Sequence, residues 1–135
     1  MSRLFIACIL AGLVALPSGA FAFNAENRHK VAPVDGAVFE VVGQPGSSPA
    51  NFWCAAADYA RDRLGARDNA RVYLVAGRGA AQSEPGRTGV RFTLEPGAAG
   101  ITPVRPQLSL SVDVIGDNLS VASGINYCYN VVSKT

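Results

Sequence analysis

Residues 48–65 read SPANFWCAAADYARDRLG, and they define the main element of the expected fold. Ser48 is a preferred N-cap residue and Pro49 suits the first helical position, whereas Gly65 is typical of the position just after a helix. Apolar residues recur on one helical face between these ends, at Trp53, Ala56, Ala57, Ala60 and Leu64. The pattern predicts a helix over residues 49–64 that docks on a sheet through Trp53. An aromatic ligand platform around Trp53 is the alternative interpretation.

Asp58 and Asp62 fall on the opposite side of this helix, four residues apart. This spacing permits two carboxylates on one face, as acid–base hydrolysis of a glycoside requires. An outward face leaves both groups in water, however, where nothing desolvates a catalytic acid. We therefore expect Asp58 and Arg61 to form a surface ion pair. A small extracytoplasmic hydrolase that uses Asp58 and Asp62 is the alternative hypothesis for function.

Several segments on either side of the helix have the composition of β-strands. Residues 37–42 and 71–76 are rich in β-branched and aromatic side chains, and residues 90–94 and 108–114 alternate between apolar and polar. Glycine- and proline-rich turns separate them. The pattern predicts a single α+β domain over residues 37–135: a small antiparallel sheet with one main helix packed on it, cross-linked by one disulfide.

Both ends of this domain are less regular in sequence. Residues 23–36 are polar and lack periodicity, which predicts a flexible N-terminal arm. Residues 119–122 predict a strand that continues as an extended segment. Val121, Ile125 and Cys128 also lie at helical spacing, so a helix is the second interpretation of the C-terminal part.

The first residues have the features of a secretory signal peptide over 1–22. Arg3 precedes an uncharged apolar run over residues 4–16, and residues 20–22, Ala-Phe-Ala, fit the small-x-small cleavage rule. The run is too short to span a bilayer as a helix. An uncleaved N-terminal anchor is the alternative. We expect a periplasmic or secreted protein that has no membrane attachment after cleavage.

Removal of residues 1–22 would leave two cysteines, Cys54 and Cys128. An exported chain with one pair of cysteines most simply forms one disulfide. In the chain-entropy model, closing so long a loop stabilises the fold by roughly 4 kcal/mol. We expect this bond to join the start of the helix to the C-terminal segment.

Composition and motifs exclude several classes of function. The chain has 135 residues, of which 49% are hydrophobic and 16% charged, and its formal net charge is +2. A near-neutral balance argues against nucleic-acid binding. The sequence has no zinc-protease, Cys-x-x-Cys, Gly-x-Ser-x-Gly or P-loop motif, so we expect no cofactor and no metal. The single histidine, His29, lies in the predicted arm, where we expect it to be solvated.

The glycine-rich segment over residues 77–89 is the candidate binding surface. It is longer than an ordinary hairpin connection. Four of its polar side chains suit an anionic or carbohydrate partner: Arg78, Gln82, Ser83 and Arg87. We therefore expect a non-enzymatic binding or cell-envelope module whose partner is a secreted or envelope macromolecule. One version is an inhibitor of a secreted hydrolase that uses this loop as a plug. An ordinary solvated loop is the alternative.

The segments WCAAADYA (53–60), VRFTL (90–94) and DNLS (117–120), together with Cys128, resemble a group of small secreted bacterial proteins without assigned function. The resemblance covers most of the chain after residue 22. It implies export and a shared framework, and it transfers no catalytic residue.

Overall fold

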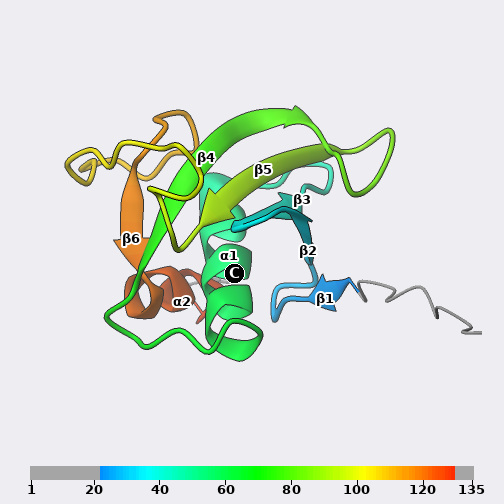
Figure 1. Cartoon of the computed structure of the whole chain (residues 1–135). Helices are drawn as coiled ribbons and strands as arrows, with labels where there is room; N and C mark the ends of the chain where they lie inside the picture. The colour runs from blue at the N-terminus through cyan, green and yellow to red at the C-terminus, as the bar shows by residue number, and fades with distance from the viewer. Residues whose placement is uncertain (1–21, 130–135) are drawn as a thin grey trace, which may run out of the picture.

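The computed structural model describes residues 22–129 of the chain. Its elements in chain order are β1 (Phe23–Asn24), β2 (Lys30–Asp35), β3 (Val38–Val42), α1 (Pro49–Asp62), β4 (Arg71–Ala80), β5 (Thr88–Thr93), β6 (Asn118–Ser120) and α2 (Val121–Tyr129). The strands form one curled antiparallel sheet in the order β1-β2-β3-β5-β4-β6, with α1 against it and α2 beside α1 (Figure 1). The predicted α+β fold with one main helix is confirmed.

The ends of α1 follow from the residues that flank it. The backbone N–H of Ser48 donates to Asn51 Oδ1 at 2.8 Å, and the Ser48 hydroxyl accepts from the Asn51 N–H. This reciprocal cap satisfies two amide groups that the first turn leaves unpaired. At the other end, Gly65 has a φ of 66° and the N–H of Ala66 donates back to the carbonyl of Ala60. The predicted start at Pro49 is confirmed, whereas the helix ends at Asp62, two residues before the predicted end at Leu64, with Arg63 as its C-cap.

Trp53 lies at the centre of the core, with 1% of its surface exposed. Its ring meets Phe92 of β5 edge-on, with 5.0 Å between the ring centroids. The indole Nε1–H donates to the carbonyl of Ser111 at 2.8 Å, so its polar atom is satisfied. The structure therefore confirms that Trp53 docks the helix on the sheet.

Small residues allow the two helices to approach closely. A Cβ added to Gly124 of α2 would stand 2.5 Å from the Cβ of Ala57 in α1, so the contact requires a glycine. Beside this contact, Cys54 and Cys128 form the predicted disulfide, with their Cα atoms 5.0 Å apart and a sequence separation of 74. The bond joins the first half of α1 to the end of α2.

The prediction of a flexible arm over residues 23–36 is wrong, because these residues form β1 and β2. Val31 is fully buried and pairs with Val41 of β3. Phe23 packs against Tyr59 of α1, with 5.6 Å between ring centroids. Sheet pairing and these two apolar contacts order a segment that has little periodicity of its own.

Two strand predictions in the C-terminal half are also corrected. β6 ends at Ser120, whose hydroxyl accepts from the N–H of Ser123, and α2 follows at once. The helical interpretation of Val121, Ile125 and Cys128 was thus the better one. Residues 108–114 form no strand, because this segment is held by single contacts instead of sheet pairing: Val112 is buried and the carbonyl of Ser111 accepts from the Trp53 indole. Among residues 22–129, no helix combines the length and the apolar character needed to cross a bilayer.

Candidate functional site

The glycine-rich segment forms a shorter turn than the sequence predicted. Residues 77–80 extend β4 and β5 begins at Thr88, so residues 81–87 make the β4–β5 turn. The guanidinium of Arg78 lies over the ring of Phe52, 4.8 Å from its centroid. Arg87, by contrast, faces Glu84, with 3.9 Å between Nε and Oε1. The two predicted arginines thus have different partners.

A buried carboxylate that the sequence analysis missed holds this turn. Glu40 of β3 is 1% exposed and accepts from the backbone N–H groups of Gln82 and Ser83 at 3.0 Å and from the Ser83 hydroxyl at 2.7 Å. Arg91 Nε lies 3.3 Å from the same carboxylate. Burial alone would raise the pKa of Glu40, but the hydrogen bonds from Ser83, Gln82 and Arg91 outweigh it and lower that pKa. The predicted site residues therefore anchor the turn, Gln82 through its backbone and Ser83 through both its backbone and its hydroxyl.

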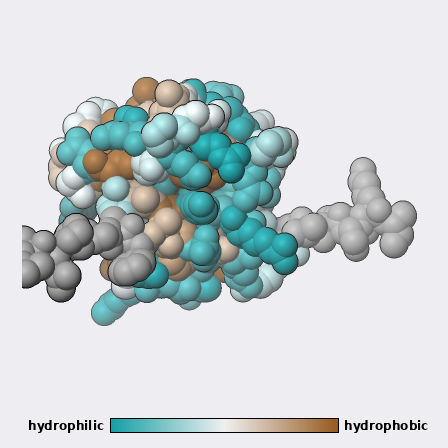
Figure 2. Space-filling model, turned by 90° about the vertical axis from the view of Figure 1, so that its right-hand side faces the viewer, coloured by the Kyte–Doolittle hydropathy of each residue, from teal (hydrophilic) through white to brown (hydrophobic). Residues whose placement is uncertain are grey.

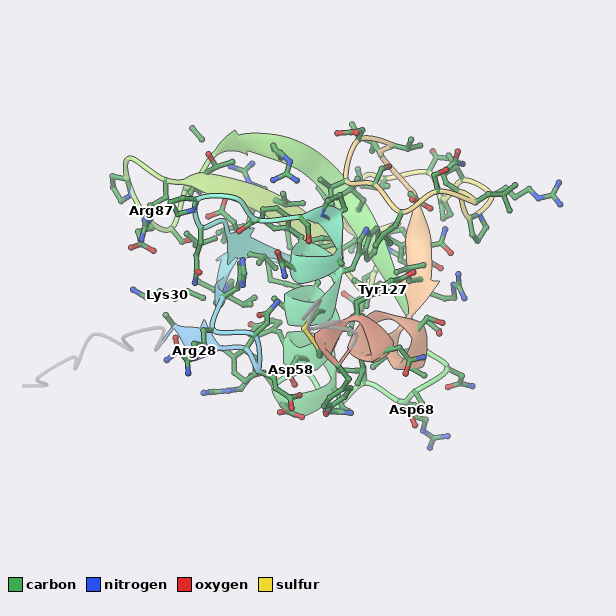
Figure 3. The ribbon with its side chains drawn as sticks, turned by 180° about the vertical axis from the view of Figure 1, so that it is seen from behind. Arg28, Lys30, Asp58, Asp68, Arg87 and Tyr127 are labelled. Carbon is green, nitrogen blue, oxygen red and sulfur yellow. A yellow bond between two sulfur atoms is a disulfide. The ribbon has the colours of Figure 1, made fainter. Side chains whose placement is uncertain are left out.

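Three basic side chains surround a small cavity of about 50 Å³ at one end of the sheet. They are Arg28 and Lys30, at the β1–β2 connection, and Arg87 in the β4–β5 turn, and Figure 3 shows them one after another along the same edge of the molecule. We call Arg28, Lys30 and Arg87 the basic edge. Of the residues predicted for the site, only Arg87 belongs to it.

The basic edge carries more positive than negative charge. Glu84 is its one acidic lining residue and lies 3.8 Å from Lys30 Nζ and 3.9 Å from Arg87 Nε. Both distances exceed hydrogen-bond length, and both cations are about half exposed. Within residues 22–129, Arg28 makes no ion pair with a carboxylate. The three cations therefore keep donors free for an anionic ligand.

The backbone around Arg28 is held in an uncommon conformation. Arg28 has a φ of 66°, and it is the one non-glycine residue among residues 22–129 whose φ is positive. Its carbonyl accepts from Gln44 Nε2 at 2.9 Å and its N–H donates to the carbonyl of Ala25. A left-handed residue with a side chain is disfavoured by roughly 1–2 kcal/mol, and such strain is often found at functional sites.

His29 fixes the same connection from inside the protein. It is buried, not solvated as predicted, and its Nε2 lies 2.8 Å from Ser47 Oγ and its Nδ1 3.2 Å from the carbonyl of Asn27. Burial lowers the pKa of His29, which favours the neutral ring. These bonds tie the β1–β2 connection to the loop before α1 and so position Arg28.

The two acidic residues of α1 do not form the exposed pair that the sequence predicted. The side chain of Asp58 is 5% exposed and accepts from the backbone N–H of Glu26 at 2.8 Å, because β1 and its turn cover this face of the helix. Asp62 stays exposed, and both carboxylates approach Arg61, at 3.8 Å for Asp58 and 3.4 Å for Asp62. Burial raises the pKa of Asp58. Its geometry is that of an anchor for the β1–β2 connection.

Other concave regions offer less chemistry. A hollow of about 260 Å³ lies between the β2–β3 turn and the end of α1, and its mostly apolar lining includes Phe39, Tyr59, Leu64 and Leu94. Within the described part of the chain, no three His, Cys, Asp or Glu side chains are grouped to hold a metal ion. The basic edge is thus the best-defined cluster of ligand-binding groups in residues 22–129.

Comparison with known proteins assigns no role to these residues. No protein-family model matches the chain, and no curated protein or solved structure matches it significantly. The geometry and charge of the basic edge are therefore the main indication of what the protein binds.

Proposed function

We propose that this protein is an exported binding module that recognises an anionic polysaccharide of the cell envelope or medium through the basic edge. The observation that carries the proposal is the convergence of Arg28, Lys30 and Arg87 on one cavity. A cavity of about 50 Å³ accommodates one carboxylate or phosphate group, not a whole ligand. Arginine donors bind both kinds of group in a bidentate manner.

A neighbouring hollow supports a polymeric partner. This second hollow shares Lys30, Val42 and Glu84 with the first and continues along β2 to Ala32 and Pro33. Its wall also includes Ala22, which cleavage would remove, so the hollow would be more open in the exported protein. Figure 2 views the molecule from this side and shows mainly hydrophilic residues with hydrophobic ones between them. Polar and apolar groups along a shallow groove suit a sugar chain, whose rings have apolar faces and hydroxyl edges.

Export is supported by the disulfide and by the sequence of the first residues. Disulfides persist in oxidising compartments, such as the periplasm or the medium. The predicted signal peptide lies outside the described residues, except for Ala22. Cleavage after Ala22 would place β1 at the new N-terminus, next to the basic edge.

The geometry does not favour a hydrolase that uses Asp58 and Asp62. Such an enzyme needs Asp58 as a free acid or base, but the carboxylate of Asp58 already accepts the N–H of Glu26 and faces Arg61. We therefore retain binding as the proposed function.

Retention on immobilised polysaccharides tests this proposal. Alginate would supply carboxylates, a phosphorylated mannan would supply phosphates, and dextran would serve as the uncharged control. The double variant Arg28→Gln/Arg87→Gln should bind the preferred anionic polymer at least about tenfold more weakly, since each charge-assisted hydrogen bond contributes about 1.5–3 kcal/mol. The variant Arg67→Gln/Arg105→Gln removes the same charge from exposed positions elsewhere and should bind within about twofold of the unmodified protein.

Two results would overturn the proposal. Absence of binding to either anionic polymer at low salt would contradict it directly. Equal weakening by the two double variants would show that net charge, and not the basic edge, controls retention.

A further inference from the structure

The segment between β5 and β6 presents a large apolar side chain to water. Residues 95–117 run from yellow to orange in Figure 1 and project on the side of the molecule opposite β1. Leu108 in this segment has a relative exposure of 107%, so it makes almost no contact with the rest of the protein. Leu108 therefore adds nothing to the core, and its whole side chain is open to a partner.

The chain is anchored just before Leu108. The backbone N–H of Gln107 donates to Asp117 Oδ1 at 3.1 Å, and the N–H of Val104 donates to the carbonyl of Gly116 at 3.1 Å. Asp117 is itself buried, with 4% of its surface exposed. Pro106 further restricts the backbone between these two anchors.

The chain is anchored again just after Leu108. The carbonyl of Ser111 accepts from the Trp53 indole at 2.8 Å, and Val112 is fully buried. A Cβ added to Gly77 of β4 would stand 2.6 Å from the carbonyl oxygen of Val112, so this close approach requires a glycine at position 77. Residues 108–110 are therefore a short span between two fixed points, with Leu108 exposed and Leu110 partly buried against the core.

The disulfide encloses this span. The bond between Leu108 and Ser109 lies within the 74-residue interval from Cys54 to Cys128. If that peptide bond were cut, the disulfide would keep the two fragments covalently joined. The anchors at Gln107 and Ser111 would hold the two new ends close to each other.

We propose that residues 105–110 bind as a substrate-like loop in the active site of an extracytoplasmic serine endopeptidase whose primary specificity pocket is apolar, with Leu108 in that pocket. Attack by the enzyme's serine Oγ on the carbonyl carbon of Leu108 forms an acyl bond and breaks the bond to the Ser109 nitrogen, which takes a proton from the enzyme's histidine. The held Ser109 amine then competes with water for the acyl group. Its return re-forms the peptide bond and releases the serine, so net hydrolysis is slow.

This inference is independent of the basic edge, and it relocates the inhibitor hypothesis from residues 77–89 to residues 105–110. A loop that is already fixed in shape loses little conformational entropy on binding, which favours tight association. A second exposed apolar residue of the same segment, Ile115, lies outside the two anchors and serves as a matched control.

Inhibition constants against chymotrypsin and trypsin test the proposal, because the first enzyme has an apolar primary pocket and the second an acidic one. The unmodified protein should inhibit chymotrypsin preferentially. Leu108→Ala should weaken that inhibition at least about tenfold, whereas Ile115→Ala should leave it within about twofold. Leu108→Arg should transfer inhibition to trypsin. Leu108 makes almost no contacts, so all of its variants should keep the melting temperature of the unmodified protein.

Mass analysis of the incubated protein gives a second readout. The expected product is one species heavier by a single water under non-reducing conditions, which separates into two chains on reduction, cut after Leu108. Rapid cleavage at many bonds, or no inhibition and no cleavage by chymotrypsin, would overturn the proposal. Failure of Leu108→Arg to act on trypsin would also overturn it. The Arg28→Gln/Arg87→Gln variant should inhibit normally.

Discussion

The carboxylate of Glu40 accepts a hydrogen bond from the backbone N–H of Ser83 at 3.0 Å, across a sequence separation of 43 residues. This bond and its neighbours fix the β4–β5 turn on β3 and thereby place Arg87 beside Lys30 and Arg28. A buried acid that does not itself line the cavity thus holds the turn that carries Arg87.

Replacement of Glu40 should therefore destabilise the protein. Glu40→Ala leaves Arg91 and two backbone N–H groups without their acceptor, and should reduce the free energy of unfolding by about 3–5 kcal/mol. Glu40→Gln should be milder, at about 1–3 kcal/mol. Urea denaturation followed by tryptophan fluorescence measures both. The exposed residue Glu95 gives the control, and Glu95→Gln should stay within about 0.5 kcal/mol.

The pH dependence of stability should carry a signature of Glu40. Folding lowers the pKa of this carboxyl below its ordinary value of 4.5. Its contribution is therefore complete above about pH 4.5 and is lost as the pH falls through the lower folded value. In Glu40→Gln this loss should be absent, so the stability difference between the two proteins should shrink on acidification. A constant difference from pH 7 to pH 3 would contradict this account.

The contribution of Asp58 to stability should change with pH in the direction opposite to that of Glu40. Burial raises its pKa above the ordinary value of 3.8, so folding favours the protonated form and stability falls as the pH rises from 3.8 through the folded value. Asp58→Asn keeps an oxygen for the Glu26 N–H and removes the buried charge. This variant should be at least as stable as the unmodified protein at pH 7 and should lose that advantage near pH 3. Asp62→Asn, at an exposed position, is the control.

Trp53→Ala should destabilise the protein by about 3–5 kcal/mol, because it leaves a large cavity between α1 and β5. The lost indole also leaves the carbonyl of Ser111 without a partner. Thermal denaturation monitored by circular dichroism measures the effect. An unchanged melting temperature would mean that Trp53 is not a core residue.

Removal of the disulfide in Cys54→Ala/Cys128→Ala should destabilise the protein by about 2–5 kcal/mol. Under denaturing conditions the protein without residues 1–22, and so without Cys8, should react with a thiol reagent only after reduction, as counted by mass spectrometry. Free thiols at both positions before reduction would contradict the bond.

Local patterns were sufficient to predict α1 and the strands around it. The cap at Ser48 and the apolar face through Trp53 are short-range signals, and both are found in the structure. The alternation in β5 holds from Val90 to Phe92 but fails at Thr93, which is buried and donates its hydroxyl to the carbonyl of Ala37. The ordered conformation of β1 and its turn, by contrast, depends on Tyr59 and Asp58 of α1, which lie more than 30 residues away in sequence. No local pattern contains such contacts.

The same limit explains what was missed at the candidate site. Arg87 drew attention because of its glycine-rich surroundings, but Arg28 and Lys30 join it only through the pairing of β2, β3 and β5. Residues 108–114 have the alternation of a strand, yet they are held by the buried Val112 and by the Trp53 indole, 58 residues from Ser111 in sequence. Glu40 is the single charged residue in the otherwise apolar sequence of β3, and this was the sequence signal that pointed to a buried polar contact.

The strand order has a consequence for how the chain folds. β2–β3 and β4–β5 are hairpins between consecutive strands, but the pairing of β3 with β5 joins them across the whole of α1, as in the contact of Glu40 with Arg91 51 residues away. Closing so large a loop before its contacts can form is slow, and domains dominated by such pairings refold in milliseconds to seconds. We expect α1 to bury its alanine face only after β3 and β5 have joined, so the rate of that step should set the refolding rate.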